Sequence, residues 1–166
     1  EQVLMSRNAG WIGPTQKMGN QEMGAIAATY LINLVAPAVL SNQFIARYQS
    51  LNAQKVILSI GSGASRTPIA GWNTYCSSKA GLDMLSKCIA EENRDFISLS
   101  IAPGKVDTPM QNDIRFADEG EFPRLKEFQN YHKKGELVAA KEVAEKYKIA
   151  LYNPTKYVDT NRVSEI

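Results

Sequence analysis

Short apolar runs alternate along the chain with longer stretches of helical periodicity. Lys55–Ile60 and Phe96–Ala102 contain β-branched residues and end at glycine or Pro-Gly, which is typical of buried parallel strands. Glu1–Met5 has the character of a short strand and runs into a turn at Asn8-Ala9-Gly10. Because such runs alternate with helical stretches, the order predicts an α/β domain with a parallel sheet.

Apolar spacing also predicts the helices and the final segment. The expected helices are Gly24–Tyr48, Asn73–Glu92, Ala139–Leu151 and a short one near Arg124–Lys133. The first has apolar residues on more than one face, and Pro37 inside it is expected to kink it. Apart from the short helix, residues 105–135 are polar and irregular. A final strand is expected within Lys156–Ile166.

Composition narrows the class of protein. The 166 residues are 44% hydrophobic and 22% charged, which fits a single domain over residues 1–166. A net charge of +2 does not favour a nucleic-acid partner. No apolar run approaches the roughly 20 residues that span a bilayer, so we expect no membrane association. The chain has two cysteines, too few for a disulfide framework, and this favours a cytoplasmic location.

Metal binding is not expected. Cys76 and Cys88 have no histidine or cysteine partners at metal-ligand spacing and are interpreted as buried small side chains. His132 is the only histidine, and its charged surroundings favour a solvated surface position over a catalytic one.

Candidate chemistry centres on Tyr75 and Lys79. Positions i and i+4 share a helix face, so the ammonium can lie beside the phenol and lower its pKa from about 10. Tyr75 would then exchange a proton with a substrate oxygen as a general acid or base. Ser62 follows a predicted strand and can hydrogen-bond the same oxygen, although Ser59 and Ser65 compete for this role. Taken alone, a Tyr-x-x-x-Lys pair is more often an exposed helical pair.

Further motifs, taken in order, resemble the short-chain dehydrogenase/reductase family. The resemblance rests on Asn8-Ala9-Gly10, Asn33, Ser62, Tyr75 with Lys79, and Pro103-Gly104 followed by Val106 and Thr108. It implies a Rossmann-type, doubly wound parallel sheet of which this chain is the C-terminal portion. Of the three serines, only Ser62 has the family's spacing to Tyr75.

The resemblance also implies residue roles. The catalytic residues are Ser62, Tyr75, Lys79 and Asn33. Asn33 would hold a water in a proton relay, whereas the alternative is a buried, hydrogen-bonded helix residue. The implied cofactor is NADP, with NAD possible. It would be held by Asn8, Ala9, Gly10, Tyr75, Lys79, Pro103, Gly104, Val106 and Thr108.

A closer resemblance points to the sepiapterin reductase and benzil reductase branch. It rests on Gly71-Trp72-x-x-Tyr75-Cys76, Val106-Asp107-Thr108-x-Met110-Gln111, Leu125-Lys126 and Lys134-Gly135-Glu136-Leu137. This branch reduces dicarbonyl groups with NADPH, which implies a small carbonyl substrate, pterin-like or aromatic. The expected substrate contacts are Ser62, Trp72, Met110 and Gln111. Trp72 and Met110 are alternatively packing residues.

Departures from the family pattern raise a second hypothesis. Arg7 stands where the family has Asn, and Ser59 and Gly61 replace Asn and the first Ser of its Asn-x-Ser-Ser strand end. The family's glycine-rich phosphate loop is absent, and the chain starts at Glu1, so we expect further N-terminal residues. The alternative is a truncated, non-catalytic interaction module. The two-sided apolar helices favour a homodimer or homotetramer.

Overall fold

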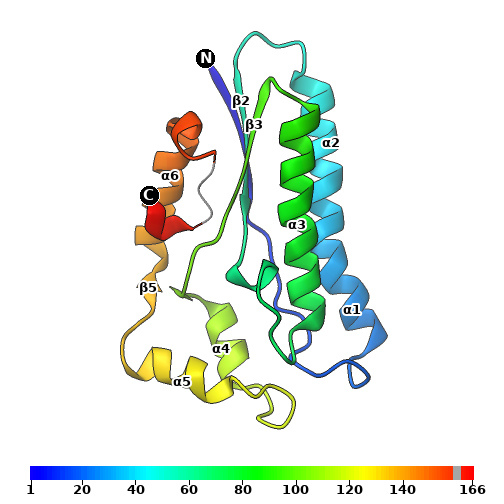
Figure 1. Cartoon of the computed structure of the whole chain (residues 1–166), viewed down its shortest axis with the longest axis vertical. Coiled ribbons are helices and arrows are strands. Elements are labelled where there is room, and N and C mark those ends of the chain that lie inside the picture. The colour runs from blue at the N-terminus through cyan, green and yellow to red at the C-terminus, as the bar shows by residue number, and fades with distance from the viewer. Residues whose placement is uncertain (159–161) are drawn as a thin grey trace.

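Three parallel strands form the centre of the molecule. The computed structural model describes residues 1–158 and 162–166. Its main sheet has the order β1-β2-β3, with β1 at Gln2–Arg7, β2 at Gln54–Ile60 and β3 at Phe96–Ile101 (Figure 1). All three predicted strands are confirmed. Val56, Ile57 and Leu58 of the central strand are fully buried, as an apolar run without alternation predicts.

Helices cover both faces of this sheet. One face carries α1 (Met23–Tyr30), α2 (Ala36–Tyr48) and α3 (Asn73–Glu92), and the other carries α6 (Ala140–Tyr152) (Figure 1). The packing is apolar on both sides. On the first, Ile57, Ile89 and Phe96 form a core with Phe44 and Ile45. On the second, the core is Leu58, Leu99, Ile101, Val143, Tyr147, Ala150 and Val163. The architecture is the expected α/β, Rossmann-type one.

The first long helix is interrupted as its proline predicts. A π-helical turn, Leu31–Val35, joins α1 to α2, and Pro37 lies in the first turn of α2. Pro37 has no N–H for the carbonyl of Asn33, four residues earlier, so a regular helix loses a hydrogen bond there. The wider turn is the irregularity that results, and Asn33 lies in it. Such turns recur at functional sites.

This helical segment overturns the expectation that no stretch of the chain is long enough and apolar enough to span a bilayer. Met23–Tyr48 spans 26 residues and, by length and composition alone, is long enough and apolar enough to cross a membrane. One side of the segment packs within the domain, where Thr29, Asn33, Pro37 and Ser41 are buried. The other side exposes apolar residues, namely Leu31, Val35, Val39 and Leu40.

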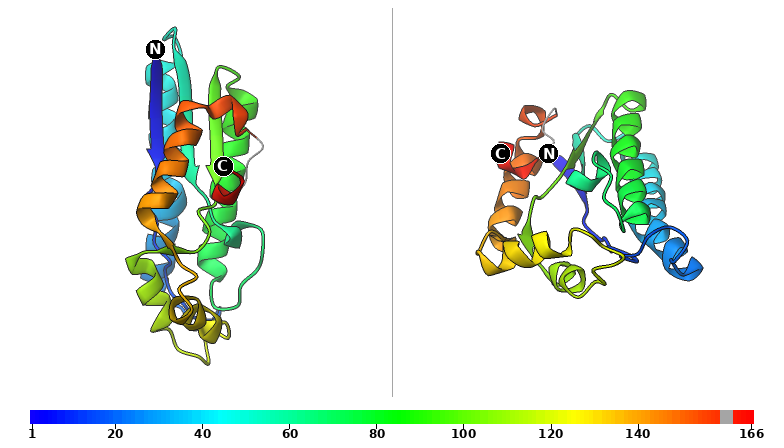
Figure 2. Two further views of the ribbon diagram at one scale, coloured as in Figure 1. Left: turned by 90° about the vertical axis from the view of Figure 1, so that its left-hand side faces the viewer. Right: turned by 60° about the horizontal axis from the view of Figure 1, so that its bottom comes forward.

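Two short helices lie beyond the carboxyl ends of the strands (Figures 1 and 2). They are α4 (Pro109–Arg115) and α5 (Leu125–Lys133), and β4 (Val106–Asp107) pairs with β5 (Val138–Ala139) beside them. The prediction of α5 is confirmed. The sequence analysis missed α4, although an extended Thr108 before Pro109 is the usual start of a helix.

The predicted final strand is wrong for the described residues. Pro154–Lys156 and Val163–Glu165 form 3₁₀ turns. A single bridge between Ala102 and Arg162 is the pairing there. Residues 159–161 of that prediction lie outside the described residues.

Candidate active site

The predicted catalytic serine and tyrosine meet at the end of β2. Ser62 is extended and begins a 3₁₀ turn, Gly63–Ser65, in which its Oγ accepts a hydrogen bond from the Ala64 N–H at 3.2 Å. The same hydroxyl is hydrogen-bonded to the phenol of Tyr75, which lies in the first turn of α3. The thirteen-residue spacing therefore produces a real contact between the two groups.

Tyr75 is buried, with 7% of its surface exposed, and this decides its acidity. Burial raises the pKa of Tyr75 above its usual value, and the Ser62 hydrogen bond only partly opposes this. The Lys79 Nζ lies 5.9 Å from the phenol ring centroid, so the ammonium lies beside the phenol as expected, but the net shift in the pKa of Tyr75 is upward and not the expected downward one. Tyr75 is protonated at neutral pH, which is the state of a general acid.

Lys79 is buried beside the turn that follows β1. Its Nζ donates to the Ile60 carbonyl at 3.0 Å. Burial lowers the pKa of Lys79 to about 8, and the charge of Asp83 opposes this shift. A Cβ on Gly10 would lie 3.4 Å from this Nζ and 3.8 Å from Oδ1 of Asn33, so the predicted turn, lysine and asparagine converge.

Asn33 has its side chain fully engaged. Its Oδ1 accepts from the Trp11 N–H at 2.9 Å, and its Nδ2 donates to the Trp11 carbonyl at 2.8 Å and to Ser78 Oγ at 3.0 Å. The side chain therefore fastens the turn after β1 to the helices. The side-chain contacts are those of the expected alternative, a buried and hydrogen-bonded helix residue.

The predicted cofactor contacts after β3 lie at the same edge of the sheet. Pro103 and Gly104 follow β3 directly, and Gly104 has φ +81° with no other group within 4 Å of a Cβ placed there. Val106 belongs to β4, and Thr108 precedes α4. Ligands of open α/β sheets bind at this edge. A side chain at position 10 would fill the space beside Lys79, and glycine leaves that space open. The residues present therefore fit the nicotinamide half of a dinucleotide.

An aromatic cluster forms one wall beside Tyr75. The Trp72 ring lies edge-on to Tyr75 at 5.7 Å and is stacked on Phe122 at 5.0 Å. Met110 packs against the same cluster. Trp72 Nε1 and Gln111 Oε1 are buried and have no hydrogen-bond partner within the described part of the chain. Trp72 and Met110 both pack in this cluster, and two buried polar atoms beside it have no partner among the described residues.

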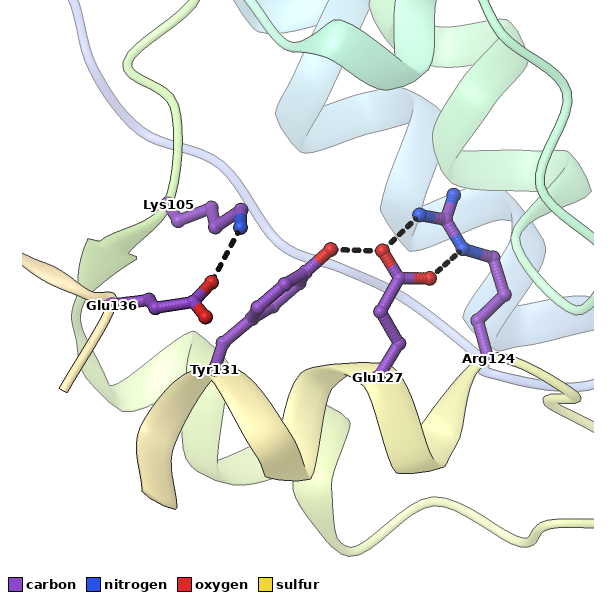
Figure 3. Close-up of polar contacts among 5 residues, drawn as sticks. All are labelled: Lys105, Arg124, Glu127, Tyr131 and Glu136. Atoms are coloured by element: carbon purple, nitrogen blue, oxygen red, sulfur yellow. Dashed lines mark hydrogen bonds and ion pairs between the residues drawn. The ribbon is translucent and has the colours of Figure 1, made fainter. Parts of the chain in front are cut away.

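A polar network joins α5 to the loop after β3 (Figure 3). Arg124 donates two hydrogen bonds to Glu127, at 2.6 and 2.7 Å, and Tyr131 donates a third. Lys105 Nζ lies 3.4 Å from the Tyr131 ring centroid and 3.1 Å from Glu136. The bonds from Arg124, with that from Tyr131, lower the pKa of Glu127 to about 2. The sequence analysis missed this network, whose helical part has i, i+3 and i, i+4 spacing.

Two departures from the family pattern meet in one buried contact. Arg7 donates to Ser41 at 2.6 Å, to Ser86 at 2.9 Å and to Ser59. Burial lowers the pKa of Arg7 to about 10. The long guanidinium at position 7 and the small serine at position 59 therefore fit each other.

The remaining candidates have simple surroundings. Among residues 1–158 and 162–166, no group of three or more His, Cys, Asp or Glu side chains is placed to hold a metal. His132 is exposed. Both cysteines were expected to be buried. Cys76 is half-buried, and the expectation is wrong for Cys88, which is exposed.

Comparison with known proteins agrees with this geometry. The family model for short chain dehydrogenases matches residues 3–119. The chain is 34% identical over 139 residues to benzil reductase ((S)-benzoin forming) of Bacillus subtilis, covering 81% of this chain and 57% of that protein. It is 28% identical over 167 residues to sepiapterin reductase of Xenopus tropicalis, covering 96% and 63%.

A solved structure is similar over most of the chain. The KRED1-Pglu enzyme superposes with a TM-score of 0.83 at 30% identity, covering 90% of this chain and 62% of that one. This chain thus spans less than two thirds of the length of each of these relatives. The ordered motifs, the Ser62–Tyr75 contact and the family match lead to one conclusion: the chain belongs to the short-chain dehydrogenase/reductase family.

Proposed function

We propose that the complete protein is an NAD(P)(H)-dependent carbonyl reductase with Tyr75 as its general acid. The observation that carries this is the buried Tyr75 phenol, hydrogen-bonded to Ser62 at the carboxyl end of β2. An interaction module would not need the nearby Lys79, whose burial costs free energy because it penalises the ammonium.

The residues divide the chemistry among them. The nicotinamide, when bound, supplies the hydride. Ser62 hydrogen-bonds the substrate oxygen and stabilises the charge that develops on it. Tyr75 gives its phenolic proton to that oxygen. Lys79, beside Gly10, binds the nicotinamide ribose, and a water on the main-chain carbonyl of Asn33 would relay a proton to Lys79.

NADP is the proposed cofactor, and the cytoplasm the proposed location. Asn8, Ala9, Gly10 and the segment from Pro103 to Thr108 would hold the nicotinamide half of the cofactor, because Gly10 borders Lys79 and the second segment follows β3. The preference for NADP rests on the benzil and sepiapterin reductase likeness. Two free cysteines, Cys76 and Cys88, agree with a reducing compartment.

An aromatic or pterin-like dicarbonyl is the proposed substrate. The aromatic cluster makes the side of the site next to Tyr75 apolar, which suits an aromatic ligand. The unpaired Trp72 Nε1 is a donor and the unpaired Gln111 Oε1 is an acceptor, which suits a ligand with a few polar groups. A sugar would leave most of its hydroxyls unpaired against this wall.

A substrate panel tests the proposed activity. The complete protein is expected to oxidise NADPH, followed by its absorbance, faster with benzil-like and sepiapterin-like compounds than with sugars, steroids or acyl thioesters. NADH in place of NADPH serves as the cofactor control. Turnover of a sugar or steroid alone would refute the dicarbonyl assignment, and no turnover of any carbonyl compound would refute the activity.

Assembly into a homodimer or homotetramer is also proposed, through the exposed apolar side of α1 and α2. Val39→Lys, at a position that is 51% exposed, is expected to lower the mass measured by light scattering without unfolding the protein. Ile149→Lys on α6, at a 45% exposed position across the sheet, is the matched control and is expected to keep the assembly. An unchanged mass in Val39→Lys, or a monomeric parent protein, would contradict this.

A further inference from the structure

Asp83 lies one helical turn after Lys79 on the same face of α3. Its Oδ2 accepts a hydrogen bond from Ser65 Oγ at 2.5 Å, and its Oδ1 accepts one from Ser100 Oγ at 2.5 Å. Ser65 Oγ also lies 2.7 Å from the Ser62 carbonyl oxygen, so its single proton is shared between two acceptors. The half-buried carboxylate is thus fixed between the turn after β2 and strand β3.

Lys79 needs such a charge nearby. It is 4% exposed, and its Nζ donates to the neutral carbonyl of Ile60. A buried ammonium without a counter-charge loses its proton readily. Within the described part of the chain, Asp83 is the acid whose charge opposes the effect of burial on Lys79.

The other elements around Lys79 bring no negative charge among the residues described. Ser62 and Tyr75 are neutral hydroxyls, and the turn after β1 and the π-helical turn contribute Gly10 and the Asn33 amide. The charged group of β1 on this face is the cation Arg7, which contacts Ser86 farther along α3.

Gly61 borders the contact between Ser100 and Asp83. A Cβ on Gly61 would lie 3.0 Å from Ser100 Oγ and 3.2 Å from Asp83 Oδ1, closer than side chains ordinarily approach. The family resemblance places a serine at this position. Glycine here therefore leaves the space in which the hydroxyl of Ser100 meets the carboxylate of Asp83.

We propose that Asp83 is a positioning residue: held by Ser65 and Ser100, its carboxylate is the counter-charge that keeps the buried Lys79 ammonium protonated. The inference rests on the proposed function for the purpose of that ammonium, which is to bind ribose hydroxyls beside Tyr75. The charge of Lys79 itself is measurable without any turnover.

The test is the titration of Lys79 in the complete protein. Lysine labelled with ¹³C at Cε is followed by NMR against pH, and the Lys79 signal is identified by its loss in Lys79→Met. The midpoint is expected near 8 in the parent protein. In Asp83→Asn, which keeps the shape and one acceptor oxygen, the midpoint is expected to fall by about one pH unit or more. The alkaline limb of the kcat/KM profile is expected to move with it.

Two variants serve as controls. Asp83→Glu keeps the charge and is expected to retain most of the parent midpoint. Glu91→Gln removes a negative charge from the exposed end of the same helix, where Glu91 pairs with Arg94, and is expected to leave the Lys79 midpoint unchanged.

The outcomes separate the two proposals. An unchanged Lys79 midpoint in folded Asp83→Asn overturns the role of Asp83. If the midpoint falls while the parent protein reduces no carbonyl compound, the role of Asp83 stands and the proposed function fails. Should Asp83→Asn not fold, Asp83→Ser decides, because it also removes the charge while keeping a hydroxyl near Ser65 and Ser100: a lowered midpoint supports the proposal, and an unchanged one overturns it.

Discussion

Tyr75→Phe is expected to lower kcat of the complete protein by about 10²–10⁴-fold, because it removes the proton that the proposed mechanism transfers to the substrate oxygen. The ring remains, so its edge-on packing against Trp72 is kept. Ser62 loses one hydrogen-bond partner, which costs about 1 kcal/mol of stability. The variant should therefore stay folded, as checked by circular dichroism, while carbonyl reduction in the NADPH assay falls.

A second buried tyrosine provides the matched control for this variant. Tyr147 is 9% exposed and donates to the Ile101 carbonyl at 2.8 Å, on the face of the sheet covered by α6. Tyr147→Phe removes an equivalent hydroxyl and hydrogen bond, so it should cost similar stability and leave kcat near that of the parent protein. Equal turnover in Tyr75→Phe and Tyr147→Phe would remove Tyr75 from its role.

Gly71→Ala is expected to lower the free energy of unfolding by about 2–4 kcal/mol. Gly71 has φ +86°, a conformation that side chains strain, and a Cβ there would lie 2.7 Å from the Glu121 carbonyl oxygen. It would also lie 3.3 Å from the Phe122 ring. Backbone must move to relieve the first contact, so the alanine disturbs both the fold and the wall beside Tyr75. Urea unfolding of the complete protein measures the loss.

Gly19→Ala separates strain from crowding. Gly19 has φ +102°, but nothing lies within 4 Å of a Cβ placed there. Its substitution should cost only the conformational strain, about 1–2 kcal/mol. A loss for Gly71→Ala no larger than that for Gly19→Ala would show that the contact with Glu121 does not constrain the fold.

The strands and the Tyr75–Lys79 pair were predictable because each depends on a local pattern. Apolar runs ending at glycine or proline place β2 and β3, and the i, i+4 spacing places Tyr75 and Lys79 on one face. Long-range environment is not encoded so directly. Spacing suggests that Lys79 lowers the pKa of Tyr75, whereas burial in the aromatic cluster raises it.

The segment after β3 was the least predictable part. Helix α4 has polar residues among its seven, including Gln111, Asn112 and Asp113, and too few turns to show periodicity. The predicted final strand failed because the apolar residues near the C-terminus, such as Val163, pack onto α6 and the sheet from 3₁₀ turns. Such tertiary contacts override local preference.

The fit between Arg7 and Ser59 carries an evolutionary consequence. Asparagine alone at position 7 would leave the hydroxyls of Ser41, Ser59 and Ser86 without their shared donor in a buried space. Asparagine alone at position 59 would crowd the guanidinium of Arg7. A lineage that passed through either single exchange would carry a less stable protein. The two positions are therefore expected to be inherited as a pair, so that arginine at one accompanies a small residue at the other.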